Sequence, residues 1–290
     1  MDSAKGVSAL TKLAPRFPQL YVAPLETNRA EHRMAVEGGI VPRGASLAHF
    51  IGSEADELRV VDTPTGPVEA LFLRARADFE CFLSIMLNDG ALVEYDPVVR
   101  GIELRGLLDW ERVRRERDTY LANGGRKWEH EFERLATQTR VFQSNLVVYT
   151  DGPYSDVPAG RVSFKDEEWI GVSRKIRLYH ECARVVIRRA EPDGVHPIWD
   201  EVVGDVVGLL AATGSYDASM AAQFLGITPL RYVGGRLGRQ LEDATVEEAD
   251  RISQAVYEAM LRVENTVSNT RPSSPFDIAI ELAHDPYLQY

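Results

Sequence analysis

Two acidic residues inside an apolar segment are the first candidates for chemistry. Residues 198–214 read IWDEVVGDVVGLLAATG and place Glu201 and Asp205 among valines and leucines. Residues four apart share one face of a helix, and a helix that is apolar around its circumference is buried. A buried carboxylate without a partner is costly or takes up a proton. We therefore expect Glu201 and Asp205 to have cationic or proton-donating partners.

The preceding long helix offers these partners. Residues 174–189 read RKIRLYHECARVVIRR, in which His180 and Arg184 are four apart and Glu181 sits beside His180. A solvated row of ion pairs explains the arginines, but it explains neither His180 nor the acids on the next helix. The pattern predicts either a structural ion pair between helices or an active site.

His180-Glu181-Cys182-Ala183-Arg184 resembles the HExxH helix of zinc metallopeptidases, with arginine in place of the second histidine. Glu201-Val-Val-Gly-Asp205 resembles the ExxxD helix of the gluzincin, or thermolysin-like, group. The two motifs lie within residues 141–214, where a strand upstream of the first helix is also expected. The chain is similar to a degenerate bacterial branch of this metallopeptidase-fold family.

The resemblance implies roles for individual residues. His180 and Glu201 match metal ligands, Glu181 matches the general base that activates a metal-bound water, and Asp205 matches the partner that orients His180. Arg184 departs from the pattern, because a guanidinium has no lone pair to give a metal and stays protonated.

The departure at Arg184 leaves two alternatives. Its guanidinium could bridge Glu181 and Glu201 and take the place of the metal. A zinc ion could instead be retained, with His196 or a substrate supplying the missing ligand.

Other segments offer weaker candidates. Tyr154 and Ser155 lie in the polar loop after the best strand, which is either a substrate-binding loop or a plain turn. The glycine-rich segment 231–239 is either a helix connection or a phosphate loop. A second HExxR, His130–Arg134, stands on a polar helix without a matching acidic helix and is expected at the surface. Cys182 is expected to be a small buried hydrophobe.

The element pattern predicts an α+β protein, with a mixed region at residues 1–125 and a mainly helical, metallopeptidase-like core at 126–290. Strands are expected at Leu20–Ala23, Leu58–Asp62 and Val141–Thr150. Helices are expected after Pro67 and at Asp109–Ala122, Trp128–Gln138, Lys165–Arg189, Ile198–Ala212 and from Thr245 to about Val267. Capping boxes are expected at Ser163–Asp166 and Thr245–Glu248.

Composition excludes several classes of protein. The 290 residues carry a net charge of −11, which disfavours nucleic-acid binding because that needs a basic face. The sequence contains no run of 18 apolar residues, which is about the length that a membrane-spanning helix needs. The N-terminal sequence has no apolar signal segment and the chain has only two cysteines, so a soluble cytoplasmic protein is expected. The apolar tail, Pro275–Tyr290, is expected to dock on the body or on a second subunit.

The motifs and their setting are compatible with three functions. The first is an enzyme on a degenerate scaffold, acting on a peptide or a small amide or acid metabolite, with Glu181 and His180 as acid and base and Arg184 at the substrate. The second is a non-catalytic scaffold or regulatory protein, in which the ion pair of Arg184 and Glu201 holds the two helices together. The third is a zinc-dependent hydrolase with a substituted ligand.

Overall fold

The computed structural model describes residues 8–138, 141–191, 193–270 and 274–284, and it is a mixed α/β structure, as the α+β expectation required. Its contacts divide the chain into two compact units. Unit 1 comprises Met1–Arg59 and Glu69–Thr150, and unit 2 comprises Val60–Val68 and Asp151–Tyr290. Among the described residues, no helix is both long enough and apolar enough to cross a membrane.

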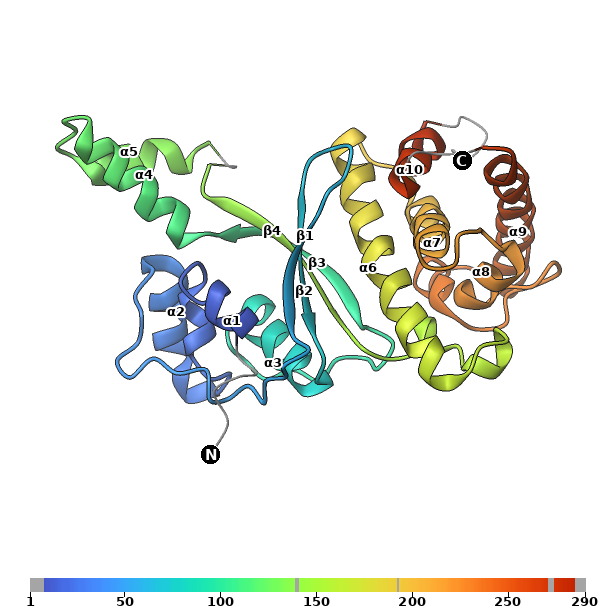
Figure 1. The fold of residues 1–290 in the computed structure, drawn as a ribbon, viewed down its shortest axis with the longest axis horizontal. Helices are drawn as coiled ribbons and strands as arrows, with labels where there is room; N and C mark the ends of the chain where they lie inside the picture. The colour runs from blue at the N-terminus through green and yellow to red at the C-terminus, as the bar shows by residue number, and fades with distance from the viewer. Residues whose placement is uncertain (1–7, 139–140, 192, 271–273, 285–290) are drawn as a thin grey trace. The chain divides into compact units, whose positions relative to one another are not determined.

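Unit 1 contains a four-stranded sheet with the order β1-β2-β4-β3 (Figure 1). The strands are β1 Glu57–Val61, β2 Val68–Leu73, β3 Gly101–Leu108 and β4 Gln143–Thr150. Strand β2 runs parallel to β4, with Ala70 opposite Val147, and β3 runs antiparallel to β4, with Ile102 opposite Val148. The inner strands β2 and β4 are almost entirely buried, which suits their apolar sequences.

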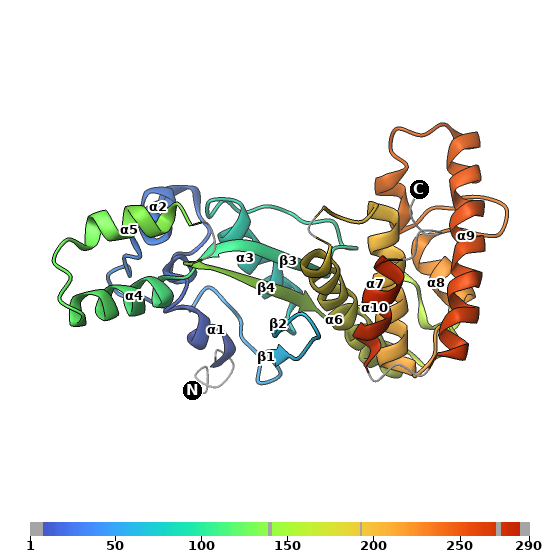
Figure 2. The same ribbon diagram turned by 90° about the horizontal axis from the view of Figure 1, so that it is seen from above.

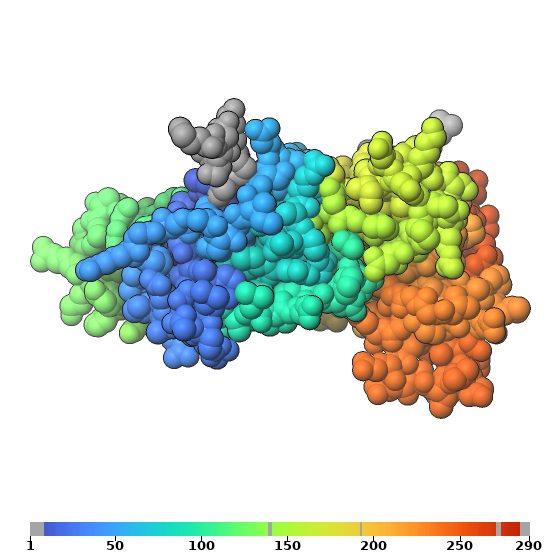
Figure 3. All heavy atoms as spheres, turned by 90° about the horizontal axis from the view of Figure 1, so that it is seen from below, coloured from blue at the N-terminus to red at the C-terminus, as the bar shows by residue number. Residues whose placement is uncertain are grey.

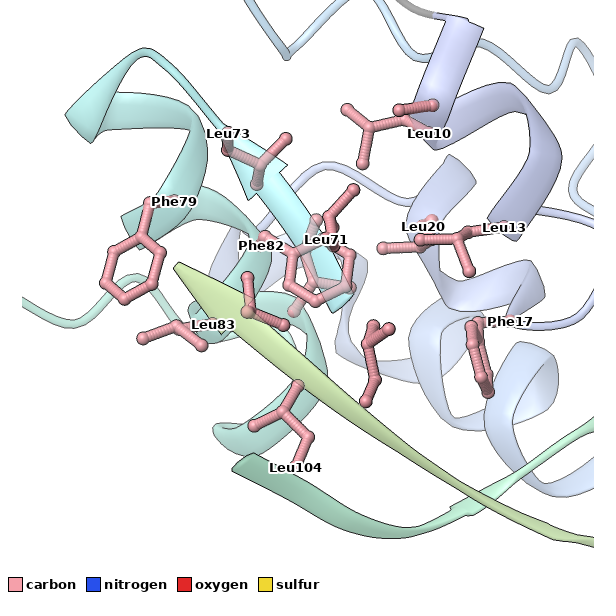
Figure 4. Packing of buried hydrophobic residues seen from close by; sticks show 14 of the residues in the cluster. Leu10, Leu13, Phe17, Leu20, Leu71, Leu73, Phe79, Phe82, Leu83 and Leu104 are labelled. Atoms are coloured by element: carbon pink, nitrogen blue, oxygen red, sulfur yellow. The ribbon is translucent and has the colours of Figure 1, made fainter. Parts of the chain in front are cut away.

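Helix α3, Arg76–Leu87, packs against β4, and leucine and phenylalanine side chains fill the space beside the sheet (Figure 4). The helices of unit 1 are α1 Ser8–Leu13, η1 Pro18–Tyr21, η2 Glu26–Asn28, α2 Arg29–Gly38, α3 Arg76–Leu87, α4 Trp110–Ala122 and α5 Trp128–Ala136. Arg16 links two elements, since it pairs with Glu69 of β2 at 2.7 Å and with Asp109, the N-cap of α4, at 2.9 Å.

The strands expected at Leu58–Asp62 and Val141–Thr150 are confirmed as β1 and β4. The strand expected at Leu20–Ala23 is wrong, because Pro18 opens the 3-10 helix η1 there. The helix expected directly after Pro67 is also wrong in its first part. Val68–Leu73 forms β2, because its buried partner β4 satisfies its backbone, and the helix begins only at Arg76.

The division between the units falls after Thr150, whereas the sequence pattern predicted a boundary near residue 125. Strand β4 pairs with both β2 and β3. A boundary near residue 125 would separate β4 from its neighbours and leave their backbone groups unpaired. Helix α5 and β4 therefore belong to unit 1, which no feature of the local sequence indicates.

Unit 2 is helical (Figure 2). Its elements are η3 Tyr154–Asp156, η4 Ala159–Arg161, α6 Asp166–Ala190, α7 Pro197–Thr213, α8 Ala218–Leu225, η5 Arg236–Gln240, α9 Val246–Asn269 and α10 Pro275–Ala283. Helices α6 and α7 pack along each other, and α10 packs against both. The rings of Tyr179 and Phe276 stack at 5.3 Å, so the described part of the tail docks on the body of its own unit.

One of the two expected capping boxes is confirmed. Thr245 and Glu248 bond reciprocally at the start of α9. The box expected from Ser163 to Asp166 is wrong. Ser163 has a left-handed φ of 61°, and α6 begins at Asp166 behind Lys165, which forms no side-chain cap. Three acids in the first turn of α6 favour its N-terminus through the helix dipole instead.

The core of unit 1 generates a stability prediction. Leu71 of β2 is fully buried, so Leu71→Ala should lower the free energy of unfolding by about 2–5 kcal/mol through lost contacts and a residual cavity. Urea denaturation measures this change. Leu92→Ala is the control, because Leu92 is 72% exposed and its loss should change stability by less than about 0.5 kcal/mol. Equal effects of the two substitutions would contradict this account of the core.

Candidate functional site: a buried charge cluster in unit 2

Helices α6 and α7 approach each other closely through two glycines. A Cβ atom on Gly204 would lie 2.5 Å from His180 Nδ1, and one on Gly208 would lie 2.8 Å from the carbonyl oxygen of Ile176. Only glycine fits at these two positions without moving α6. This small-residue face of α7 brings the acids on either side of Gly204 to the histidine of α6. These glycines were not among the residues predicted from the sequence, although their spacing of four in a buried helix was a readable sign.

Eight side chains gather at this contact, and we call them the charge cluster. They are Tyr154, His180, Glu181, Arg184, Asp200, Glu201, Asp205 and Arg236. The pairing expected from the sequence is present. His180 Nδ1 lies 3.1 Å from Asp205 Oδ1 and His180 Nε2 lies 3.7 Å from Glu201 Oε2. Asp205 is completely buried, so its charge must be balanced inside the protein.

Tyr154 completes the surroundings of Asp205. Its hydroxyl donates to Asp205 Oδ1 at 2.7 Å and lies 2.8 Å from His180 Nδ1. Burial raises the pKa of Tyr154 well above its ordinary value, so the phenol keeps its proton. Its neighbour Ser155 has a left-handed φ of 52°, an uncommon conformation for a residue with a side chain. The expected substrate residues Tyr154 and Ser155 therefore lie at the cluster, with the Tyr154 hydroxyl bonded to protein groups.

Arg236 supplies the main positive charge. Its Nη2 atom donates to both oxygens of Asp205, at 2.6 and 2.5 Å, and its Nη1 donates to the Tyr154 hydroxyl at 2.7 Å. Its Nε atom lies 2.8 Å from Glu201 Oε2 in an ion pair that lacks hydrogen-bond alignment. One guanidinium thus contacts both Glu201 and Asp205 of α7, an arrangement that suits its planar, forked shape.

The electrostatics of the two acids follow from this contact. Burial alone would raise the pKa of Asp205 and of Glu201. The positive charge of Arg236, with a smaller contribution from His180, outweighs burial and lowers both pKa values below their ordinary range. Both carboxylates are therefore ionised and paired in the folded protein.

The loop that carries Arg236 is fixed by close backbone contacts. Gly226 ends α8 with a left-handed φ of 74°, and a Cβ on Gly235 would lie 2.5 Å from the Gly226 Cα. The Tyr232 hydroxyl also bonds both the amide and the carbonyl of Gly235 at 2.9 Å. Residues 229–235 lie largely at the surface, in orange in Figure 3. The glycines thus serve a tight helix connection that aims Arg236 inward.

Arg184 forms the outer edge of the cluster. Its Nε atom donates to Asp200 Oδ2 at 2.7 Å, and its Nη1 lies 3.6 Å from Glu201 Oε1 and 4.0 Å from Glu181 Oε2. The expected position of Arg184 between Glu181 and Glu201 is present, but its closest partner is Asp200. Arg236, whose guanidinium makes the closer contact with Glu201, was missed from the sequence. The one sign available was that two buried acids need more positive charge than Arg184 alone provides.

The residues present do not fit a zinc ion. The candidate ligands His180 and Glu201 face each other, but two guanidinium groups lie within 4 Å of Glu201 and would repel a metal cation. His196, the suggested replacement ligand, caps α7 by accepting the amide of Ile198 on its Nδ1 atom. Across the ranges that the structure describes, no group of three or more His, Cys, Asp or Glu side chains has a geometry that could hold a metal.

None of the remaining candidates is a member of the charge cluster. Glu131 and Arg134 of the second HExxR form an exposed ion pair, as expected of a surface helix. Cys182 is buried within α6, as expected. Burial raises the pKa of Cys81 to about 12, which disfavours the thiolate form at neutral pH.

Comparison with known proteins identifies the family of the chain. A model described as a family of unknown function (DUF7005) matches residues 2–275, and the chain belongs to this family. Neither the curated proteins nor the solved structures gave a match.

The pairing of Arg236 can be tested by removing its charge. Arg236→Met should lower the free energy of unfolding by about 3–5 kcal/mol, because it leaves the buried acids of α7 without their main cation. The matched control is Arg239→Met, a change at an exposed arginine of the same short helix, which should have an effect below about 0.5 kcal/mol. A loss from Arg236→Met no larger than that of the control would contradict the pairing.

The depressed pKa values of Asp205 and Glu201 predict a pH dependence. Their ionised forms stabilise the fold at pH values above their ordinary pKa values of 3.8 and 4.5, and this stabilisation is lost as the pH falls through the lower folded-state values. The free energy of unfolding should therefore decrease as the pH is lowered below about 4.5. Urea denaturation between pH 7 and pH 3 measures this decrease. Asp205→Asn should reduce the loss of stability at low pH. Asp243→Asn, which changes an exposed acid, should leave that loss unchanged. Equal acid dependence in all three proteins would count against the assignment.

Proposed function

We propose that unit 2 is a non-catalytic scaffold or regulatory unit that keeps a gluzincin-like pair of helices and fixes them with guanidinium groups in place of a metal. The observation that carries this proposal is the position of Arg236, whose guanidinium contacts Asp205 and Glu201 together. An arginine there supplies the positive charge that a metal would otherwise provide to these side chains.

The contacts of His180 support a structural role rather than acid–base catalysis. Its Nδ1 atom is within 3.1 Å of Asp205 and 2.8 Å of the Tyr154 hydroxyl, and its Nε2 faces Glu201. A general base needs a nitrogen that can reach the proton of a substrate. The side chain of His180 is only 4% exposed, so a substrate would have to displace part of the cluster to reach it.

Two geometric features support the likeness to the gluzincin helices. The HExxR segment of α6 faces the ExxxD segment of α7, and Asp205 contacts His180 Nδ1, which is the pairing that the resemblance implies. His180 Nε2 points toward Glu201, the other implied ligand. In this proposal Arg184 and Arg236 have taken over the space that the implied metal would need.

A second candidate function, metal-independent acid–base chemistry, is favoured by Glu181. Its side chain is 9% exposed and its contact with Arg184 is 4.0 Å long, beyond hydrogen-bond distance. It is therefore less firmly paired than Asp205, and acid–base chemistry needs a side chain that a ligand can contact. Glu181→Gln separates the candidates, because it should abolish turnover under this function and cause only a small loss of stability, from its long contact with Arg184, under the scaffold function.

Metal analysis tests the proposed function. Purified protein should contain substoichiometric zinc, and chelation should leave its Tm unchanged, because guanidinium groups balance the acids of α7. One zinc per chain that survives dialysis, with a Tm that falls on chelation, would overturn the proposal.

A designed variant tests the likeness to the gluzincin helices separately. Arg184→His combined with Arg236→Ala restores a second histidine and removes the closest guanidinium, so it should gain zinc binding measurable by calorimetry. Arg184→His alone should bind zinc more weakly, because Arg236 still occupies the acids. Failure of the double variant to bind zinc, while it remains folded, would reject the likeness and leave the metal-free proposal standing.

A further inference from the structure

A pocket of about 430 Å³ lies in unit 2 where helices α7 and α9 begin. It is lined by His196, Ile198, Trp199, Ala244, Glu248, Arg251, Ile252, Ala255 and Val256. None of these residues belongs to the charge cluster. The volume falls in the range that small-molecule sites occupy.

The floor of the pocket is apolar. Ile198, Trp199 and Val256 are buried at 2–7% exposure, and Ile252 and Ala255 are half-buried beside them. An aromatic residue and aliphatic side chains at this depth suit a flat apolar body of about the size of two fused rings.

The rim carries hydrogen-bond donors. His196 Nδ1 accepts the amide of Ile198 at 3.3 Å, so its Nε2 atom carries the proton and is a donor. Arg251 lies exposed on the first turns of α9 and adds a guanidinium. Both α7 and α9 also begin at this pocket, and the N-terminal ends of helices favour negative charge.

Glu248 is the one acid of the rim, and it is already engaged. Its Oε2 atom accepts from the amide and the hydroxyl of Thr245, each at 2.9 Å, in the capping box of α9. These hydrogen bonds, together with the charge of Arg251, lower the pKa of Glu248. The Oε2 atom of Glu248 is therefore committed to the helix cap, and the donors on the rim are His196 Nε2 and the guanidinium of Arg251.

The geometry points to a binding site for a small carboxylic acid with an aryl-sized apolar body, whose rings lie on Trp199 and Val256 and whose carboxylate meets Arg251 and His196. This site is independent of the proposed function of the charge cluster, because the two share no residue. A non-catalytic unit with such a pocket would respond to a metabolite of this class.

The test uses the full chain and three matched probes. They are 2-naphthoate, its neutral amide 2-naphthamide, and the cation 2-naphthylmethylamine, each titrated by calorimetry with heteronuclear NMR to locate the site. We expect saturable binding of 2-naphthoate, weaker binding of the amide, and the weakest binding of the amine. Arg251→Ala should weaken 2-naphthoate about tenfold, as the loss of a charge-assisted hydrogen bond does, and leave the amide unchanged.

Two further variants assign the binding to the pocket. Ala255→Trp should fill the space and abolish binding of both naphthoate and amide, whereas Glu258→Ala, at an exposed position of α9 that does not line the pocket, should change neither. If Ala255→Trp does not fold, NMR shifts confined to the lining residues of the wild-type protein make the same assignment. Absence of binding, preference for the amine, or binding that Ala255→Trp leaves intact would overturn the proposal.

Discussion

The contact between the Arg236 guanidinium and the completely buried Asp205 is the interaction on which unit 2 depends. Asp205 cannot be ionised at the centre of the helix pair without a cation, and Arg236 reaches it from the start of η5, after α8 and the glycine-rich loop. A buried ion pair adds little net stability compared with apolar packing, yet breaking one is costly. The pair therefore acts mainly to specify one arrangement of α6, α7 and the loop that follows α8.

The arrangement explains why unrelated features of the sequence occur together. Gly204 makes room for the His180 ring, and Gly226 and Gly235 make room for each other's backbone. The left-handed conformation of Ser155 places its hydroxyl 3.2 Å from Arg236 Nη1. Only the left-handed conformation of Ser155 is unfavourable by itself, and together these positions deliver the donors that two buried acids require.

Much of unit 2 could be read from its sequence because the relevant interactions are local. Helical periodicity placed α6, α7 and α9 within a few residues, and the rule that buried acids need partners placed His180 and Arg184 beside Glu201 and Asp205. Arg236 could not be found in this way, because its contact spans 31 residues and depends on the course of a glycine-rich loop.

Unit 1 was harder to predict for the same reason. The segment after Pro67 is apolar enough to be a buried helix or a buried strand, and its pairing with β4, more than 70 residues later, decides between them. The boundary predicted near residue 125 differs from the observed division for the same reason, because the pairing of β2 with β4 extends unit 1 to Thr150. The distinction between a metal centre and an ion-pair centre likewise rests on a residue outside the motif, since Arg184 alone left both alternatives open.

A double-mutant cycle on Arg236→Met and Asp205→Asn tests the central contact most directly, because it isolates the interaction between the two side chains from their other contacts. The free energy of unfolding would be measured for the wild-type protein, both single variants and the double variant. We predict a favourable coupling energy of about 1–3 kcal/mol, with the double variant less destabilised than the sum of the single variants. A coupling energy near zero, with the two losses simply adding, would contradict the contact and its role in holding α6, α7 and the Arg236 loop together.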